Sequence, residues 1–449
     1  MSASRSAVVG GRRAEILDTA AAVFASSGYV GTSLKHIADA CGIQAGSLYH
    51  HFDSKEAIVI ELVARFQAEM ASIGDAALSS LAGDPAAARS ANAPGEQVVA
   101  LCTAIAECAF AHRAALQMTF YEPPAGASAE LAELVSARPA SVLAAMTAIL
   151  RCAQAGGSIK PGVDVTLLAE ELVEAMRHAG LGVLYRDANA REVAAVLCHL
   201  VLDGGPADPP GDGQLDRSAA RRAANAAIRA WGDRDGADPG DRTAVLLSVA
   251  RAEFARRGYE ATTIRDIAAA AGIGPGNVYR FIESKDAMLE LIMGAFHARL
   301  SDGYRAVIAS DSTTVAQLDA LTWLNIHVLE SFPEEFAIQR AWMRAIPPAA
   351  SNLSALQQER AGQIKRIVAE GVRRGELRDG RTGVGRPSIA VLAMCYRDLV
   401  WPSALVKLAG PERALAHCRA TLIRGAAPAA DLSQLNSLAS NDLSTYWQN

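Results

Sequence analysis

The chain has 449 residues, of which 51% are hydrophobic, and its formal net charge is −5. A chain of this length can form two or three domains that each bury a core, and its negative charge argues against a protein that coats nucleic acid non-specifically. Seven dispersed cysteines without a C-x-x-C pair predict reduced, mostly buried thiols rather than a disulfide framework or a zinc site.

The N-terminal segment, MSASRSAVVGGRRAEIL, carries charged residues directly behind a very short apolar stretch. A secretory signal needs a longer apolar region, and no run of eighteen or more apolar residues occurs in the chain. A twin-arginine export signal at Arg12 and Arg13 is disfavoured because no hydrophobic region follows the pair. We therefore expect a cytoplasmic protein without a membrane span.

The first predicted element is a helix whose apolar residues recur at the 3.6-residue period. They are Ile16, Leu17, Ala20, Val23 and Phe24. We expect Gly28 to end this helix in the left-handed conformation. Thr32 or Ser33 can cap a short second helix that Gly42 ends, and a third helix follows over about residues 45–50. This succession is the helix-turn-helix pattern.

Helical patterns without alternating strands continue to about residue 203. The next segment, Asp203–Asp216, is rich in glycine, proline and aspartate, which is typical of a linker. Further along, RSAARRAANAAIRAWG predicts a basic helix with four arginines roughly on one side. They are Arg217, Arg221, Arg222 and Arg229. Treated as a flexible coil, the linker would have a root-mean-square span of about 30–37 Å, which is long enough to join two units.

An internal repeat relates the second half of the chain to the first. FASSGYVGTSLKHIADACGIQAGSLYHHFDSKE aligns without a gap with FARRGYEATTIRDIAAAAGIGPGNVYRFIESKD, so that Phe24 and Tyr49 recur as Phe254 and Tyr279. Pro275 suits the first position of the second copy's third helix, where its missing N–H costs nothing.

These patterns predict an all-α protein made of two tandem units. The predicted divisions are a first helix-turn-helix domain at 1–57, a helical effector or dimerisation domain at 58–203, a linker at 204–241, a second helix-turn-helix domain at 242–287, a second helical domain at 288–427 and a weakly ordered tail at 428–449.

The segment GTSLKHIADACGIQAGSLYHHFDSKEAI resembles the DNA-binding signature of the TetR family of bacterial transcriptional regulators, T-x-x-x-I-A-x-x-x-G-[IV]-x-x-G-x-[LF]-Y-x-[HY]-F-x-[SN]-K. ATTIRDIAAAAGIGPGNVYRFIESKDAM is similar, but Phe281 and Ile282 replace the usual His-Phe pair. The remaining regions resemble the family's ligand-binding domain only in length and helicity. The resemblance implies a tandem TetR regulator, and fused relatives suggest lipid or sterol genes as targets.

Side chains at the front of a recognition helix read bases in the major groove, and groups beside it hold phosphates. In the first copy we assign DNA contacts to Thr32, Ser33, Lys35, His36, Gln44, Ala45, Gly46, Ser47, Tyr49, His50 and Lys55. In the second copy we assign them to Thr262, Thr263, Arg265, Gly274, Pro275, Gly276, Asn277, Tyr279, Arg280 and Lys285. The resemblance implies that Tyr49 and Tyr279 bind phosphate; the alternative is a core tyrosine with a hydrogen-bonded hydroxyl.

The adjacent pair His50 and His51 does not predict a metal site. Neighbouring residues on a helix point about 100° apart, whereas residues four apart share a face. The second copy has Arg280 and Phe281 at these positions. We expect His50 to face DNA and His51 to pack, and we expect no metal.

Aromatic residues in the two helical halves either line a ligand cavity or belong to ordinary core. They are Phe110, Phe120, Tyr121, Trp323, Phe332, Phe336, Trp342 and Trp401. The resemblance implies a small, apolar effector that loosens DNA binding through a coupling of about 1–3 kcal/mol; its binding residues stay unknown. No P-loop, G-x-S-x-G or H-E-x-x-H motif occurs, so we expect no enzymatic activity and no cofactor.

Two organisations remain open. In the first, the chain folds as a pseudo-dimer and binds double-stranded DNA at an asymmetric operator, alone or in a larger assembly. In the second, only the first head binds DNA and the second copy serves dimerisation, because Phe281 and Ile282 break the signature.

Overall fold

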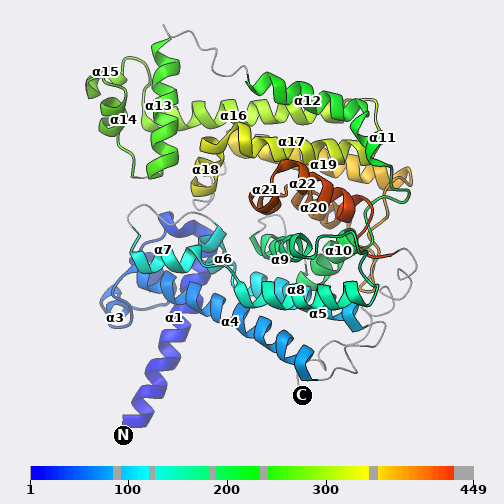
Figure 1. Ribbon diagram of the computed structural model, residues 1–449. Helices are drawn as coiled ribbons and strands as arrows, with labels where there is room; N and C mark the ends of the chain where they lie inside the picture. Colours follow the sequence, from blue (N-terminus) through cyan, green and yellow to red (C-terminus); the bar gives the residue numbers. More distant parts are fainter. Residues whose placement is uncertain are drawn as a thin grey trace.

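The computed structural model describes residues 2–83, 93–120, 127–181, 189–232, 241–259, 261–342 and 352–428. Within these ranges every regular element is helical, apart from two isolated β-bridges, and the predicted all-α class is confirmed. Figure 1 shows the two halves stacked on each other, with both helix-turn-helix segments at the same end of the molecule.

The first half contains ten helices among the described residues. They are α1 (Ser2–Gly31), α2 (Leu34–Ala40), α3 (Ala45–Tyr49), α4 (Lys55–Gly83), α5 (Ala93–Ala111), α6 (Arg113–Phe120), α7 (Ala129–Ser136), α8 (Ala140–Ala155), α9 (Val165–Leu181) and α10 (Ala190–Leu202). The expected stop at Gly28 is wrong, because α1 continues to Gly31. A glycine costs a helix only about 1 kcal/mol, so it does not force an end.

The remaining helices belong to the linker region and the second half. They are α11 (Asp212–Asp216), α12 (Ala219–Gly232), α13 (Arg242–Arg257), α14 (Ile264–Ala270), α15 (Pro275–Val278), α16 (Lys285–Ile308), α17 (Thr314–Ser331), α18 (Pro333–Trp342), α19 (Asn352–Arg373), α20 (Ile389–Leu399), α21 (Ser403–Ala409), α22 (Pro411–Cys418) and the π-helical turn η4 (Arg419–Ile423). Here the equivalent glycine, Gly258, does end its helix, at φ +80°.

The helix predicted within the linker is confirmed as α12, and residues 204–232 are therefore ordered rather than a flexible coil. Helix α12 packs along α16 and α17 (Figure 1). Its Trp231 is buried against Phe332, with ring centroids 5.2 Å apart, and Arg221 lies over the Trp323 ring at 3.8 Å. One arginine of the predicted basic face is therefore turned into the protein, and only residues 233–240 lie outside the described part of this segment.

The two halves meet where α9 and α10 pack against α20, α21 and η4. Backbone hydrogen bonds cross this contact: Ala426 N–H donates to Val201 O at 3.0 Å, and Ala427 N–H donates to Leu202 O at 2.8 Å. A separate apolar cluster fills the same region and consists of Leu167, Ile326, Leu405, Ala414, Leu415 and Cys418. The contact therefore resembles a continuous protein interior rather than a loose domain boundary.

Two glycines allow the backbones of the halves to approach closely. Gly204 and Gly425 have φ of +81° and +71°, a conformation that favours glycine. A Cβ added to Gly425 would lie 2.5 Å from the carbonyl carbon of Asp203, and one added to Gly204 would lie 2.8 Å from the Gly425 nitrogen. Any side chain at either position would push the halves apart.

Buried and half-buried polar groups also link the halves. His417 Nε2 and Glu171 Oε2 lie 3.1 Å apart, and Lys160 Nζ donates to the carbonyls of Arg424 and Gly425 at 2.9 and 2.6 Å. Burying polar groups is costly unless they are paired, so these pairs favour one relative position of the halves.

Two segments are long and apolar enough to span a membrane by length and composition alone, Ala129–Ala155 and Ile389–Ala409, and a bent pair, Gly95–Ala111 with Arg113–Thr119, would be a third. In the structure the first comprises α7 and α8 and the second α20 and α21. Their apolar residues pack in the helical interior, α8 against α4 and α9 and α20 against α19.

Candidate nucleic-acid interface

Each head holds its helix-turn-helix on a small core. In the first head Leu17 of α1, Ile37 of α2 and Leu48 of α3 are fully buried. Ser33 caps α2: its Oγ accepts from the His36 N–H at 3.1 Å, and its own N–H donates to His36 Nδ1. Gly42, at φ +64°, then ends the helix and directs the chain into α3.

Helix α3 presents nearly all of its surface to solvent. Leu48 alone is buried among the residues of α3, whereas Gln44, Ala45, Gly46, Ser47 and His50 are exposed. The Tyr49 side chain is 54% exposed, which excludes the core alternative for this tyrosine. A Cβ added to Gly46 would meet no atom within 4 Å, so the fold itself does not require glycine there.

The second head repeats this arrangement position by position. Val278 is buried like Leu48, whereas Gly274, Pro275, Gly276, Asn277 and Arg280 are exposed and Tyr279 is 58% exposed. Thr263 caps α14 by accepting from the Asp266 N–H, and the Asp266 carboxylate accepts from the Thr263 N–H at 2.9 Å. The two recognition surfaces therefore share a scaffold and differ in side chains.

Phe281 and Ile282, which replace the usual His-Phe pair of the signature, do not disrupt the second head. Ile282 is 5% exposed and occupies the buried position of Phe52, which is 2% exposed, while Phe281 is 40% exposed at the position of His51. The smaller Ile282 fills the same core site, and the helix-turn-helix keeps its geometry.

Two of the predicted DNA contacts are wrong. Thr32 and Thr262 are buried, so their hydroxyls cannot reach a duplex. The Thr262 Oγ1 donates instead to the Gly258 carbonyl at 2.8 Å, at the end of α13. The neighbouring residues, Ser33 and Thr263, supply the helix caps and stay exposed.

Lys55 and Lys285 point into their heads rather than outward. The Lys55 ammonium donates to the carbonyls of Tyr29 and Thr32 at 2.7 and 2.9 Å and lies 4.1 Å from the centre of the Tyr29 ring. Lys285 makes the same bonds to Tyr259 and Thr262, at 2.9 and 3.0 Å. These lysines hold the loop before the cap, so a role in DNA binding would be exerted through that loop.

Arg13 of α1 makes a set of contacts within the first head that the sequence does not predict. The Arg13 guanidinium lies 4.1 Å from the Phe52 ring centre, donates to the His51 carbonyl and pairs with Glu61. Cation–π contacts of this kind contribute about 0.5–2 kcal/mol. These contacts hold the backbone at half-buried His51, whereas His50 is exposed and its contact with DNA stays a prediction.

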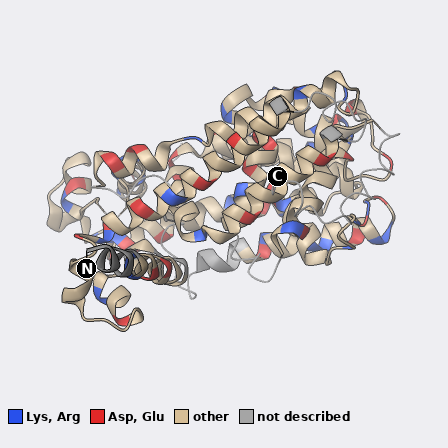
Figure 2. Ribbon diagram, turned by 90° about the horizontal axis from the view of Figure 1, so that it is seen from below, with Lys and Arg blue, Asp and Glu red and all other residues tan. Residues whose placement is uncertain are grey.

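Positive charge near the recognition helices is local. Lys35, Arg265 and Arg280 are exposed and form no ion pair with the residues that the structure describes. Figure 2 shows Lys and Arg interspersed with Asp and Glu along the helices seen in this view. Such a surface suits a specific DNA contact better than non-specific coating.

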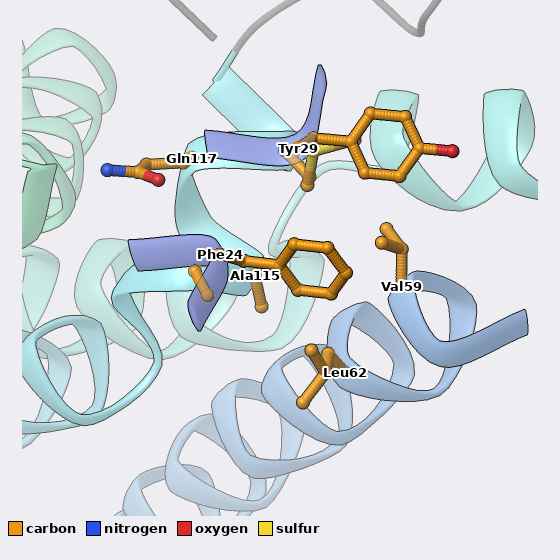
Figure 3. A pocket seen from close by; sticks show the side chains of 8 residues that line it. Phe24, Tyr29, Val59, Leu62, Ala115 and Gln117 are labelled. Carbon is orange, nitrogen blue, oxygen red and sulfur yellow. The ribbon is translucent and has the colours of Figure 1, made fainter. Parts of the chain in front are cut away.

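A hollow lies between the first head and its helical half. It contains about 310 Å³ of empty space, part of it open to solvent, and is lined by Phe24, Tyr29, Val59, Leu62, Ala114, Ala115, Gln117 and Met118. Figure 3 shows Phe24 and Tyr29 of α1 above Val59 and Leu62 of α4. Its enclosed part has room for about one water molecule at most, so a larger ligand requires the head to move.

The aromatic residues considered for a ligand cavity fall mostly in packed surroundings. Phe332 is buried between Trp231 and Phe296, and Trp323 donates its indole N–H to Asn225 at 2.9 Å. Phe336 and Trp401 pack together, with ring centroids 6.1 Å apart. The side chains of Phe120 and Trp342, and all of Tyr121, lie outside the described residues.

Comparison with known proteins identifies the family. The family described as "Bacterial regulatory proteins, tetR family" matches residues 16–62 and 246–292. The transcriptional repressor KstR2 of Mycolicibacterium smegmatis is 34% identical over 159 residues, which cover 35% of this chain and 72% of that protein. KstR2 of Rhodococcus jostii is 57% identical over 56 residues, 12% of this chain and 28% of the relative, so this match spans less than a third of that repressor.

Among solved structures, the ketosteroid transcriptional regulator KstR2 of Mycobacterium tuberculosis is 25% identical, with a TM-score of 0.34, and covers 40% of this chain and 91% of its own. The family match occurs once in each head, at the helices whose geometry is described above. The chain therefore belongs to the TetR family of bacterial regulatory proteins and carries the family's DNA-binding segment twice.

Proposed function

We propose that the chain is a transcriptional repressor whose two unlike heads bind the unlike half-sites of one asymmetric operator. The observation that carries the proposal is that both recognition helices expose the same positions with different side chains. The pairs are Gln44 and Gly274, Ala45 and Pro275, Ser47 and Asn277, and His50 and Arg280. Repression is inferred from relatives that are named transcriptional repressors.

The packing of the halves supports binding as an intramolecular pseudo-dimer. A symmetric homodimer presents identical heads and therefore requires a palindrome, with half-sites about one helical turn (34–36 Å) apart. In this chain both heads lie at one end of the molecule and the halves share a buried contact (Figure 1). One chain therefore offers two different reading surfaces without a second copy, although two chains side by side remain an outcome of the test.

An exchange of base-facing residues tests the proposal. The substitutions Gly274→Gln, Asn277→Ser and Arg280→His give the second head the first head's side chains at three exposed positions. We expect the wild type to protect unlike half-sites as one chain, and the variant to prefer a palindrome of the first half-site. Footprinting and mass measurement of the complex provide the readout. Wild-type protection of a perfect palindrome by the first heads of two chains would overturn the proposal.

The alternative is that the second head does not bind DNA and serves dimerisation. It is favoured by Phe281 and Leu291, which are exposed apolar residues at the positions of His51 and Glu61. Tyr279→Phe with Arg280→Ala decides between the two. The leading proposal predicts a loss of affinity comparable to that of Tyr49→Phe with His50→Ala in the first head, whereas the alternative predicts no loss.

We further propose that a small apolar effector binds a helical half and lowers DNA affinity. The hollow beside α6 supports coupling, because its walls come from both the first head and its helical half. A relative of the heads, KstR2 of Mycobacterium tuberculosis, is described as a ketosteroid transcriptional regulator, so sterol or lipid genes are the proposed targets. Displacement of operator DNA by a ketosteroid, with an unrelated apolar ligand as control, tests this step.

The proposed role is regulatory rather than catalytic, and its place is the cytoplasm, where the bacterial chromosome lies. Relatives at the heads are named as transcriptional regulators, which supports both points.

A further inference from the structure

Three side chains with metal-binding chemistry converge where α5 meets α6. Cys108 and His112 are four residues apart, so they lie on one face of the helix end, and Glu69 faces them from α4. His112 Nε2 and Glu69 Oε2 are 2.8 Å apart, and the three ligand atoms lie within 4.8 Å of one another. No other group of this kind occurs among the residues that the structure describes.

These donors match zinc better than the hard cations. A thiolate, an imidazole and a carboxylate are the protein ligands of Zn²⁺, at about 2.0–2.3 Å, whereas Mg²⁺ and Ca²⁺ prefer oxygen alone. A pair of ligands four apart on a helix is an arrangement that zinc proteins use. Three protein ligands leave a fourth position for water or another small ligand.

The surroundings allow entry and fix the ligands. The Glu69 side chain is 51% exposed, so an ion can reach the cluster from solvent, while Cys108 is buried behind it. The His112 ring packs against Phe66, with centroids 5.8 Å apart. Metal binding would replace the thiol proton and release it to solvent.

The cluster lies at the junction that carries the first head. His112 separates α5 from α6, and α6 packs on α1 and lines the hollow beside Phe24 and Tyr29. The second copy does not repeat it, because Arg299 stands at the position of Glu69 when Phe66 is aligned with Phe296.

We propose that Glu69, Cys108 and His112 form a Zn²⁺ site that fixes the junction between the first head and its helical half. The fourth position is open, and the site belongs to the first copy alone. Its influence on DNA would act on the first half-site, a step that rests on the proposed function.

Titration of metal-free protein with Co²⁺, a coloured substitute for Zn²⁺, tests the site without DNA. We expect one equivalent to bind, with the near-ultraviolet absorption of a cobalt–thiolate bond, and Zn²⁺ to displace it. Cys108→Ser should abolish the thiolate band, and His112→Asn and Glu69→Gln should weaken binding at least tenfold. Cys152→Ser, at an exposed cysteine of α8, is the matched control and should change nothing.

Circular dichroism of each variant establishes that it folds. If Co²⁺ does not bind the folded wild type, or binds equally well to folded Glu69→Gln with His112→Asn, the proposal is wrong. DNA binding is then measured separately: zinc binding without any effect on the first half-site would preserve the site and refute only its link to DNA.

Discussion

The substitution Gly425→Ala should uncouple the two halves of the chain. Gly425 has φ +71°, and its Cα faces the backbone of residues 202 and 203 at the end of α10. The added methyl would lie 2.5 Å from the Asp203 carbonyl carbon and 2.7 Å from the carbonyl oxygens of Asp203 and Leu202. Backbone atoms cannot rotate away as the end of a side chain can, so the halves must separate.

Two terms set the magnitude. The left-handed conformation costs a residue with a Cβ about 1–2 kcal/mol, and overpacking a filled site costs about 1–3 kcal/mol. We therefore expect Gly425→Ala to lower the free energy of unfolding by about 2–5 kcal/mol. Gly157→Ala is the matched control, because Gly157 has φ +83° but a Cβ there meets nothing within 4 Å. In Gly157→Ala the free energy of unfolding should fall only by the cost of the left-handed conformation, about 1–2 kcal/mol.

Urea unfolding followed by two signals measures the effect. All five tryptophans follow the first half in the sequence. The three whose side chains the structure describes, Trp231, Trp323 and Trp401, lie in the second half or in α12 packed on it, so their fluorescence reports on the second half. Far-ultraviolet circular dichroism reports on both halves. We expect the two curves to coincide for the wild type and Gly157→Ala and to separate for Gly425→Ala, because loss of the contact ends shared cooperativity.

Equal losses in Gly425→Ala and Gly157→Ala, with coincident curves in both, would refute the reasoning. That result would mean that the close approach of the backbones contributes nothing to coupling.

Three further predictions concern the heads and the second core. Tyr49→Phe should weaken DNA binding alike for all sequences, whereas Gln44→Ala should alter base preference by about 1–3 kcal/mol; a changed preference in selection experiments with Tyr49→Phe would contradict this. Lys55→Met should destabilise the first head by about 1.5–3 kcal/mol, since two carbonyls lose a charged donor, and unchanged hydrogen exchange in α1 and α2 would refute it. Burial, and then the charge of Arg360, lowers the pKa of His297 to about 3. Because the unfolded state binds the proton more readily, stability should fall as the pH drops below about 6.5, by about 1.4 kcal/mol between pH 7.5 and 5.5. Urea unfolding of folded His297→Asn should not show this pH-dependent loss of stability. If the pH dependence of the variant equals that of the wild type, the assignment to His297 is wrong.

Local signals explain why the heads were predictable. Helix period, a hydroxyl cap and a glycine at positive φ act within a few residues, and all three occur in both copies. The same signals left the choice between Thr32 and Ser33 open. The structure makes Ser33 the cap and buries Thr32, because a register of one residue decides which hydroxyl faces the helix end.

Contacts between distant residues explain what sequence reasoning missed. Lys55 finds its carbonyl partners 23 and 26 residues earlier, and Arg13 reaches Glu61 from 48 residues away. The spacing of Cys108 and His112 is visible in the sequence, but Glu69 joins them only because α4 packs beside α5. The sequence predicts helix α12 but not its packing: buried Ala220, Ala224 and Trp231 seat it on the second half.

The contact between the halves has a consequence for synthesis. Lys160 bonds to carbonyls 264 and 265 residues further along the chain. At about 5–20 residues per second, the ribosome delivers those partners roughly 10–50 s after Lys160. Throughout that interval the apolar sides of α9 and α10 are not yet covered by α20, α21 and η4. Neighbouring nascent chains on the same messenger RNA expose the same apolar surface, so two first halves can pair with each other. Fast elongation, or a chaperone that holds the first half, therefore favours the one-chain form over pairs of first halves.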